Sequence, residues 1–291
     1  MTWLITGGTG QLGIALAQEL SRRDLPFSSV GSKDLDVTNG SALHNFVGKL
    51  APTVIVNCAG WTDVDGAEAH EELAARVNSD GAANVAFAAK SCGAKLIHIS
   101  TDYVFSGQSQ HPYGVNTAKN PQSAYGRTKA DGEDRILGEY SQDTWIIRTA
   151  WLFSPWGKNF AKTMTRFALC GEGEVRVVDD QSGQPTSAAD LANQVVSLAL
   201  AQAPAGIYHA TNGGEATWFD FASEIFKCVG VDVKRLVPIA THVYGQRAIR
   251  PTYSVLSHDM WNKTTLPPMR DWRQALKEAM PEIITSIKTL G

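Results

Sequence analysis

Tyr125 and Lys129 are the two side chains of this sequence best suited to acid–base chemistry. On a helix, a spacing of four residues places the phenol and the amine on one face. A tyrosine, with a pKa near about 10, is a poor acid at neutral pH, but a neighbouring cation stabilises its phenolate and draws that pKa toward neutrality. Such a pair can donate a proton to a ketone oxygen during reduction.

Thr101 lies at the end of an apolar stretch that finishes in hydroxyl and carboxylate groups, Ser100, Thr101 and Asp102. At the carboxyl edge of a parallel sheet, where such folds bind ligands, Thr101 could hydrogen-bond both a substrate carbonyl and the Tyr125 hydroxyl. The alternative is that Ser100 and Thr101 only cap a helix.

A glycine-rich segment, Thr6–Gly13, follows the first apolar run and precedes a helical pattern. Here Gly7 permits a sharp turn, Gly10 lets the backbone approach a pyrophosphate, and Gly13 allows close helix packing. The amino end of the following helix offers free N–H groups to phosphates. A dinucleotide site is favoured over the alternative, a tight structural turn.

The segment after the second predicted strand bears on the choice of coenzyme. Ser32 and Lys33 are small and basic groups that could accept the 2′-phosphate of NADPH. NADH stays possible, because Asp34 or Asp36 could serve as the acid that binds ribose hydroxyls.

The elements that must position these residues alternate between short strands and helices. This alternation predicts an α/β fold with a doubly wound parallel (Rossmann) sheet. The expected strands of the first half are Trp3–Thr6, Phe27–Val30, Thr53–Asn57, Lys95–Ser100 and Thr144–Thr149, and the expected helices include Gln11–Arg23 and Leu73–Ser91.

The second half has a looser pattern and gathers prolines in a loop-rich region. We therefore expect an NAD(P)-binding domain over residues 1–150 and a smaller substrate-binding region over residues 151–291, with the chain free to cross back between them. Its expected strands are Val175–Val178 and Ile207–Ala210, and its expected helices are Ala188–Gln202, Trp218–Val229 and Asp271–Leu290.

Composition describes an ordinary globular enzyme. The 291 residues carry a formal net charge of −3, which favours neither nucleic acid nor an anionic membrane as a partner. No apolar stretch approaches the roughly 20 residues of a transmembrane helix, and the first residues do not resemble a signal peptide, so a cytoplasmic location is expected. The four cysteines are widely spaced, and no metal site is predicted.

Seven motifs in order give the sequence a specific resemblance along nearly its whole length. The sequence resembles the dTDP-4-dehydrorhamnose reductases, which belong to the extended short-chain dehydrogenase/reductases. The motifs are Gly7–Gly13, Val56–Thr62, Ser100–Gly107, Tyr125–Lys129, Arg148–Trp151, Asp180–Thr186 and Arg250–Leu256.

The resemblance implies that NAD(P)H reduces the 4-keto group of dTDP-4-dehydro-L-rhamnose. Tyr125 would donate the proton, Lys129 would lower its pKa and hold the nicotinamide ribose, and Thr101 would tune the tyrosine while touching the sugar. The implied coenzyme contacts are Gly10, Gln11 and Leu12 at the pyrophosphate, Asp36 and Val37 at the adenine side, and Ala59, Gly60, Trp61 and Thr62 between them.

The resemblance also implies a sugar pocket lined by Val64, Asp102 and Trp151. Further candidates for the nucleotide and its phosphates are Asn159, Gln181, Thr186 and Arg250, each of which could instead only hold a loop in place. The chain would act as a monomer or homodimer.

Two other functions stay open. Gly66 and Trp61 depart from the usual family residues, so a related reductase acting on another dTDP-4-keto-6-deoxy sugar is one alternative. The other is a non-catalytic regulatory homologue, of the kind that partners methionine adenosyltransferase.

Overall fold

The computed structural model describes residues 1–288 and is built around one parallel sheet. All strand pairs of this six-stranded sheet are parallel, and the strand order is β10-β5-β4-β3-β1-β2. The strands are β1 (Trp3–Thr6), β2 (Phe27–Val30), β3 (Val54–Asn57), β4 (Lys95–Thr101), β5 (Thr144–Thr149) and β10 (Gly206–His209). The expected doubly wound α/β fold is confirmed.

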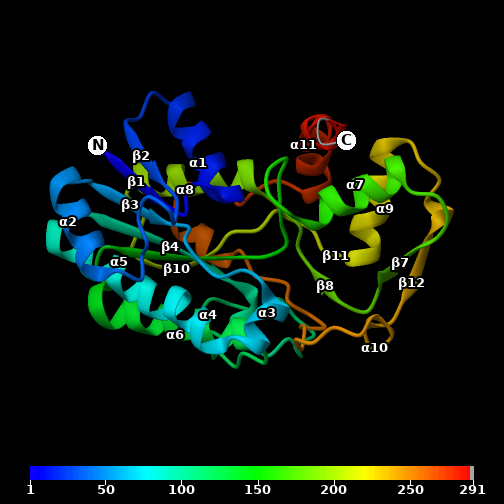
Figure 1. Cartoon of the computed structure of the whole chain (residues 1–291), viewed down its shortest axis with the longest axis horizontal. Helices are drawn as coiled ribbons and strands as arrows, with labels where there is room; N and C mark the ends of the chain where they lie inside the picture. Colours follow the sequence, from blue (N-terminus) through cyan, green and yellow to red (C-terminus); the bar gives the residue numbers. More distant parts are fainter. Residues whose placement is uncertain (289–291) are drawn as a thin grey trace.

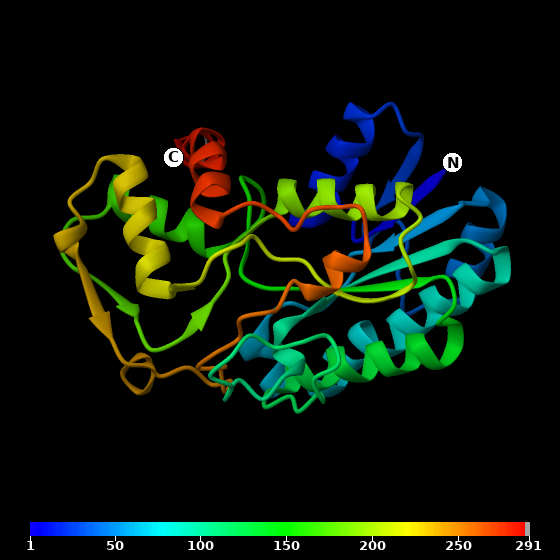
Figure 2. The ribbon, with the colours of Figure 1, turned by 180° about the vertical axis from the view of Figure 1, so that it is seen from behind.

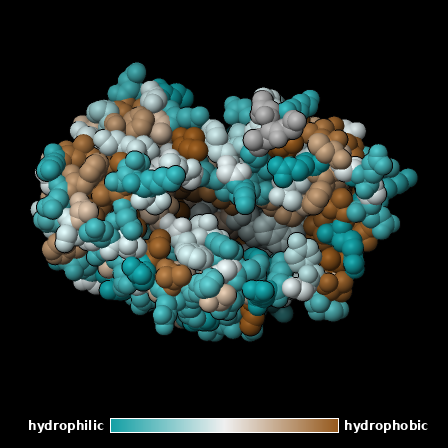
Figure 3. All heavy atoms as spheres, viewed as in Figure 1, coloured by the Kyte–Doolittle hydropathy of each residue, from teal (hydrophilic) through white to brown (hydrophobic). Residues whose placement is uncertain are grey.

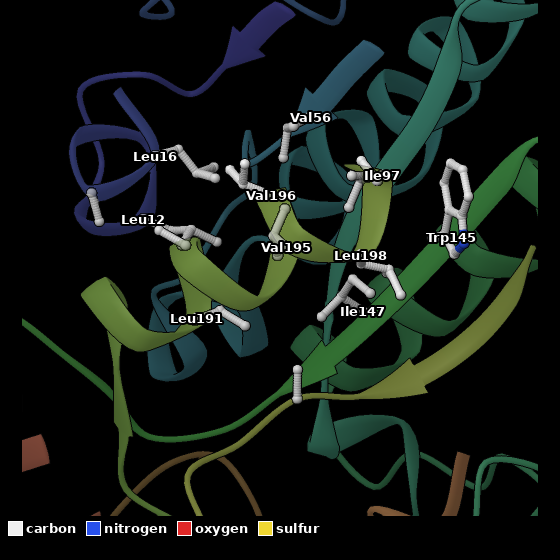
Figure 4. Packing of buried hydrophobic residues seen from close by; sticks show 14 of the residues in the cluster. Leu12, Leu16, Val56, Ile97, Trp145, Ile147, Leu191, Val195, Val196 and Leu198 are labelled. Atoms are coloured by element: carbon white, nitrogen blue, oxygen red, sulfur yellow. The ribbon is translucent and has the colours of Figure 1, made fainter. Parts of the chain in front are cut away.

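Helices cover both faces of this sheet because successive strand residues point to opposite sides. In β1, for example, Ile5 packs in the core under α1 and α8, whereas Leu4 packs in the core on the opposite face. Figure 4 shows the first of these cores, and Figures 1 and 2 show the layers. The helices are α1 (Gln11–Arg22) and α8 (Ala188–Leu200) on one face, and α2 (Gly40–Leu50), α5 (Gly81–Cys92) and α6 (Ala124–Tyr140) on the other.

A smaller region stands beside the carboxyl ends of the strands, with its own apolar core (Figure 1). It holds three helices, α7 (Phe160–Cys170), α9 (Trp218–Val229) and α11 (Trp272–Lys288), and a parallel strand pair, β7 (Val175–Val178) with β12 (Leu236–Ile239). Shorter elements complete it: β6 (Leu152–Phe153), β8 (Ser182–Gly183), β9 (Thr186–Ser187), β11 (Ala216–Thr217) and α10 (Thr241–Tyr244).

The chain crosses between the two regions more than once. After entering the smaller region it returns to supply α8 and β10 to the large sheet, and it then leaves again. The boundary at residue 150 therefore does not separate the two regions in space, because α8 and β10 follow it in sequence but pack with the large sheet. The expected last helix ran to Leu290, and its final two residues lie outside the described part of the chain.

The helix expected over Leu73–Ser91 is interrupted. The structure has α4 (Glu71–Ala75), a π-helical turn (Arg76–Asp80) and then α5. A π-helical turn is often found at a functional site. Here it holds Asn78, whose side chain bonds both the N–H and the C=O of Trp61 in the loop after β3.

No helix within residues 1–288 combines the length and apolar character that a membrane crossing requires.

Candidate active site

A cavity of about 820 Å³ opens where the carboxyl ends of the strands face the smaller region. Figure 3 shows this face hollowed between its left and right halves. A doubly wound sheet places its ligand at this edge. The lining residues come from both regions, from Gly7 near the start of the chain to Arg250 near its end.

The glycine-rich turn forms one end of the cavity and fits a dinucleotide. Gly7 has a φ of +67°, and a Cβ placed there would lie 2.6 Å from the amide nitrogen of Ala59. A Cβ on Gly13 would lie 2.5 Å from the carbonyl oxygen of Gly7. Since no side chain caps the amino end of α1 at Gly10, its first N–H groups stay open to a phosphate. Gly10, Gln11 and Leu12 line the cavity there.

The segment after β2 lines the same end only in part. Ser32, Asp36 and Val37 reach the cavity. Lys33 does not line it and is exposed on the surface turn, so the structure gives no support to Lys33 as a coenzyme contact. The tight turn after Gly31, closed by a hydrogen bond from its N–H to Asp34, directs Lys33 toward solvent.

The loop after β3 forms the middle of the cavity. Ala59, Gly60, Trp61 and Thr62 all line it. Asn57 accepts a hydrogen bond from the Ala59 N–H at 3.2 Å, and Asn78 accepts one from the Trp61 N–H at 2.8 Å. Two buried amide side chains thus hold this loop against the sheet.

Thr101, Asp102 and Tyr125 meet at the centre of the cavity. The Thr101 hydroxyl donates to Asp102 Oδ1 at 2.9 Å and accepts from the Tyr103 N–H at 3.2 Å. Thr101 therefore does cap a short helix, Asp102–Val104, and its side chain interacts with the Tyr125 phenol. Burial raises the pKa of Asp102 to about 6, although the bond from Thr101 opposes this.

Tyr125 reaches the cavity but has a phenol that resists ionisation. Burial raises its pKa above the ordinary value, the hydrogen bond with Thr101 lowers it, and the charge of Asp102 raises it further. A phenol that keeps its proton at neutral pH is a donor ready for a developing alkoxide. The expectation of a pKa drawn toward neutrality does not hold in this arrangement.

The reason lies in the direction of Lys129, which is 4% exposed. Its Nζ donates to the carbonyl oxygen of Ile99 at 2.6 Å and lies 3.2 Å from His98 Nε2. Burial also lowers the pKa of Lys129 to about 8, while Glu133 raises it. The amine thus faces the interior of the sheet as well as the cavity.

Two stacked indoles form the other end of the cavity. The rings of Trp151 and Trp218 lie 3.5 Å apart at an interplanar angle of 9°. Trp151 has a φ of +47°, and Gly183 leaves room for its ring, since a Cβ there would lie 2.6 Å from Trp151 Cε2. Trp218 Nε1 donates to Gln181 Oε1 at 3.1 Å.

Arg250 also borders this end, from the last long loop. Its guanidinium donates to Tyr103 Oη at 3.0 Å and to Asp65 Oδ2 at 2.8 Å. Its buried Nε has no hydrogen-bond partner within residues 1–288. Only two of the five N–H donors of this guanidinium have a protein partner in the described part of the chain, and Arg250 lines the cavity, so the cation can still bind an anionic group there.

Asn159 links the two ends. It caps α7, and its Nδ2 donates to Gln11 Oε1 at 2.9 Å. Gln11 accepts a second bond from Ser154 at 2.8 Å. The amide of Gln11, next to the glycine-rich turn, thus accepts hydrogen bonds from two residues of the smaller region.

Two of the predicted substrate residues lie behind the cavity wall. Gln181 is buried between Trp218 and Thr241, with Nε2 donating to Thr241 Oγ1 at 2.9 Å. Thr186 is buried in β9, paired with Leu152 of β6. Neither lines the cavity, so their contact with the substrate stays a prediction.

Apart from Lys33, the other predicted site residues all line this one cavity. Trp218 is the main lining residue that the sequence analysis missed, because it begins a helix and belongs to none of the recognised motifs. Others that it missed include Thr9, Cys58, Tyr103, Gly157 and Lys158.

Comparison with known proteins assigns a family to this arrangement. Residues 1–284 match the model of the RmlD substrate binding domain. The chain belongs to this family. It is 43% identical over 285 residues to a dTDP-4-dehydrorhamnose reductase of Streptomyces griseus, a match that covers 97% of this chain and 93% of that protein.

Two further relatives show the range within the family. A dTDP-4-keto-6-deoxy-D-glucose reductase of Streptomyces niveus is 42% identical over 279 residues, covering 96% of each chain. A crystal structure of dTDP-4-dehydrorhamnose reductase from Bacillus anthracis in complex with NADP superposes with a TM-score of 0.93 at 37% identity, covering 97% of this chain and 99% of that one. The RmlD-family chain therefore resembles reductases of more than one sugar nucleotide.

Proposed function

We propose that this chain reduces the 4-keto group of dTDP-4-dehydro-L-rhamnose to give dTDP-L-rhamnose. The coarser assignment comes with family membership: the chain is an NAD(P)H-dependent dTDP-sugar ketoreductase. The observation that carries the proposal is the position of the Tyr125 hydroxyl. It stands with Thr101 at the centre of one cavity, between a glycine turn and an aromatic end.

In the proposed reaction, each of four side chains in the cavity has a separate role in catalysis or binding. Tyr125 donates its proton to the carbonyl oxygen, and Thr101 orients the phenol and hydrogen-bonds the sugar. The guanidinium of Arg250 would bind the nucleotide diphosphate, and the indole of Trp151 would pack against the sugar nucleotide. A bound nicotinamide coenzyme would supply the hydride.

We propose NADPH as the preferred coenzyme, with NADH as a weaker substitute. Ser32 lines the adenine end of the cavity and can hydrogen-bond a 2′-phosphate, whereas Asp36 beside it suits a ribose hydroxyl. We also propose that the chain acts as a monomer or as a homodimer.

A related sugar is the second candidate. The similarity to the Streptomyces niveus dTDP-4-keto-6-deoxy-D-glucose reductase nearly equals that to the Streptomyces griseus dTDP-4-dehydrorhamnose reductase. Both substrates would need the same tyrosine and would differ in the contacts around the sugar ring.

The deciding experiment follows the loss of reduced-nicotinamide absorbance when the purified protein meets each of these two sugar nucleotides. NADPH and NADH are run in parallel, and the product is identified by NMR. Formation of dTDP-L-rhamnose is the expected result. Turnover of only the other sugar would replace the proposed substrate. A lack of turnover with both, together with binding of methionine adenosyltransferase, would favour the regulatory function.

A further inference from the structure

A row of four buried polar side chains crosses the sheet beneath the cavity. Thr6 of β1, Asn57 of β3, His98 of β4 and Lys129 of α6 follow one another, and none is more than 4% exposed. Thr6 Oγ1 donates to Asn57 Oδ1 at 2.7 Å, Asn57 Nδ2 lies 3.0 Å from His98 Nδ1, and His98 Nε2 lies 3.2 Å from Lys129 Nζ. Of these residues only Lys129 belongs to the catalytic group that the family resemblance implies.

The orientation of the Asn57 amide is decided by its neighbours. The backbone N–H of Ala59 can only donate, and it points at Asn57 Oδ1 at 3.2 Å. Thr6 donates to the same oxygen. The other end of the amide is therefore the NH₂ group, and it donates to His98 Nδ1.

This donation decides the tautomer of His98. A nitrogen that accepts a hydrogen bond carries no proton, so Nδ1 is bare and the neutral ring carries its proton on Nε2. The doubly protonated ring is disfavoured as well, because burial and the nearby Lys129 hold the pKa of His98 well below its ordinary value. His98 therefore directs an N–H toward Lys129 Nζ.

An ammonium has three donors and no acceptor, so it would oppose that N–H. A neutral amine satisfies both neighbours: its lone pair accepts from His98 Nε2–H, and one of its protons goes to the carbonyl oxygen of Ile99 at 2.6 Å. We infer that His98 acts as a hydrogen-bond donor that favours the neutral amine of Lys129 over the ammonium in the coenzyme-free protein. His98 is thus a positioning residue that acts through the lysine.

The other ionisable groups around Lys129 are Cys58 after β3 and Glu133 one turn along α6. Cys58 is neutral near pH 7, because burial raises the pKa of its thiol to about 12. Glu133 is committed to Arg148, whose Nη2 donates to its Oε2 at 2.7 Å. Burial outweighs the charge of Glu133 and lowers the pKa of Lys129 to about 8, in the direction that the hydrogen-bond row requires.

The consequence for catalysis rests on the proposed function. A neutral lysine cannot stabilise the Tyr125 phenolate, so the lysine must take up a proton before the pair can work. Protonation in turn requires the His98 N–H to be turned away or the tautomer to be reversed. Reductase activity is then expected to decline as the pH rises through the pKa of Lys129.

The first test is made on the whole wild-type protein without coenzyme. Nitrogen-15 NMR of labelled histidine distinguishes a bare Nδ1 from a bare Nε2, and His98 is assigned with a His98→Gln variant. A bare Nδ1 with a protonated Nε2 is expected at pH 9, above the pKa of Lys129. A protonated Nδ1, or a doubly protonated ring, would overturn the inference.

The second test titrates Lys129, whose carbon-13 ε signal is assigned by its loss in Lys129→Met. The signal is expected to titrate well below the exposed lysines, near the pKa of about 8. Titration together with the surface lysines would overturn the inference.

An Asn57→Asp variant should reverse the direction of the hydrogen bond between residue 57 and His98. The carboxylate still accepts from Thr6 and Ala59 but also accepts from His98, so the proton of the ring should move to Nδ1 and the pKa of Lys129 should rise. An added charge alone would raise that pKa without changing the tautomer, and an unchanged tautomer would contradict the inference. His44→Gln, at an exposed histidine of α2, is the matched control and should change neither signal.

These signals do not depend on turnover. If the protein fails to reduce both sugars while the NMR results hold, the proposed function is wrong and the inference about His98 stands. If it reduces the sugar but His98 carries its proton on Nδ1, only the inference fails.

Discussion

The two ends of the cavity differ in whether backbone or large side chains form their walls. The coenzyme end consists of backbone and small residues at the ends of neighbouring strands, with Gly7 packed against Ala59. The sugar end consists of large side chains from segments far apart in sequence, with Trp151 stacked on Trp218 and Arg250 bonded to Asp65. A backbone cradle suits an invariant coenzyme, whereas exchangeable side chains suit a family whose members differ in their sugar.

This contrast predicts that changes at each end affect different ligands. The reacting centre between them should respond in turnover alone, the glycine turn in coenzyme affinity, and the stacked indoles in sugar affinity.

The largest effect is expected for Tyr125→Phe. Loss of the proton donor should lower kcat by about 10²- to 10⁴-fold and leave the Kd for NADPH unchanged. Steady-state kinetics and a fluorescence titration of NADPH measure the two quantities. Tyr244→Phe, at an exposed tyrosine, serves as the control. A Tyr125→Phe enzyme that keeps full turnover would remove the tyrosine from its assigned role.

Gly7→Ala should act on the coenzyme end alone. The new methyl group would lie 2.6 Å from backbone atoms of Cys58 and Ala59 at a φ of +67°. Strain of about 1–3 kcal/mol should weaken NADPH binding roughly 5- to 150-fold. Calorimetric titrations with NADPH and with dTDP measure both ends of the cavity. Gly48→Ala in α2, where a Cβ meets no atom within 4 Å, is the control. Equal losses for both ligands would break the proposed separation.

Asp102→Asn, at the centre of the cavity between the two ends, should change the free energy of unfolding. Burial raises the pKa of the Asp102 carboxyl to about 6, so this group favours folding at low pH, and that contribution is lost as the pH rises through about 6. The asparagine variant should therefore be more stable than wild type by about 1–2 kcal/mol at pH 8. The difference should vanish near pH 4. Urea unfolding at both pH values measures it, and a variant that is less stable at pH 8 would contradict the raised pKa.

Trp218→Ala should give the smallest effect and act on the sugar end. Loss of the stacking partner of Trp151 costs about 0.5–1.5 kcal/mol, which corresponds to a rise in KM for the sugar nucleotide of roughly 2- to 10-fold. Trp218→Phe keeps a stacked ring but loses the hydrogen bond to Gln181, so it separates the two contributions. A change in the Kd for NADPH of similar size would show that the ends are not independent.

Much of the parallel sheet was predictable from the sequence. The expected strands Trp3–Thr6, Phe27–Val30 and Thr144–Thr149 match the structure residue for residue. Trp3–Thr6 and Thr144–Thr149 are short runs rich in apolar and β-branched residues, and such local signals do not depend on the rest of the chain. The glycine turn and the Tyr125–Lys129 spacing were readable for the same reason, since each is a requirement of a few consecutive residues.

Features that depend on distant contacts could not be read in this way. The π-helical turn at Arg76–Asp80 positions Asn78 against the loop after β3, and the return of β10 to the sheet joins residues far apart in sequence. Gln181 and Thr186 lie in a recognisable motif, yet packing places them behind the wall, while Trp218 lies in no motif and is brought to the cavity by α9.

Lys129 shows both what the local sequence predicts and what only distant contacts decide. Its spacing from Tyr125 follows from helix geometry, so the sequence by itself determined that the two side chains share a face. Which groups the amine meets was decided only by the tertiary structure, which buries it against His98 and Ile99. The charge of a buried amine depends on the donors, acceptors and solvent around it, and those come from strands that only folding brings together.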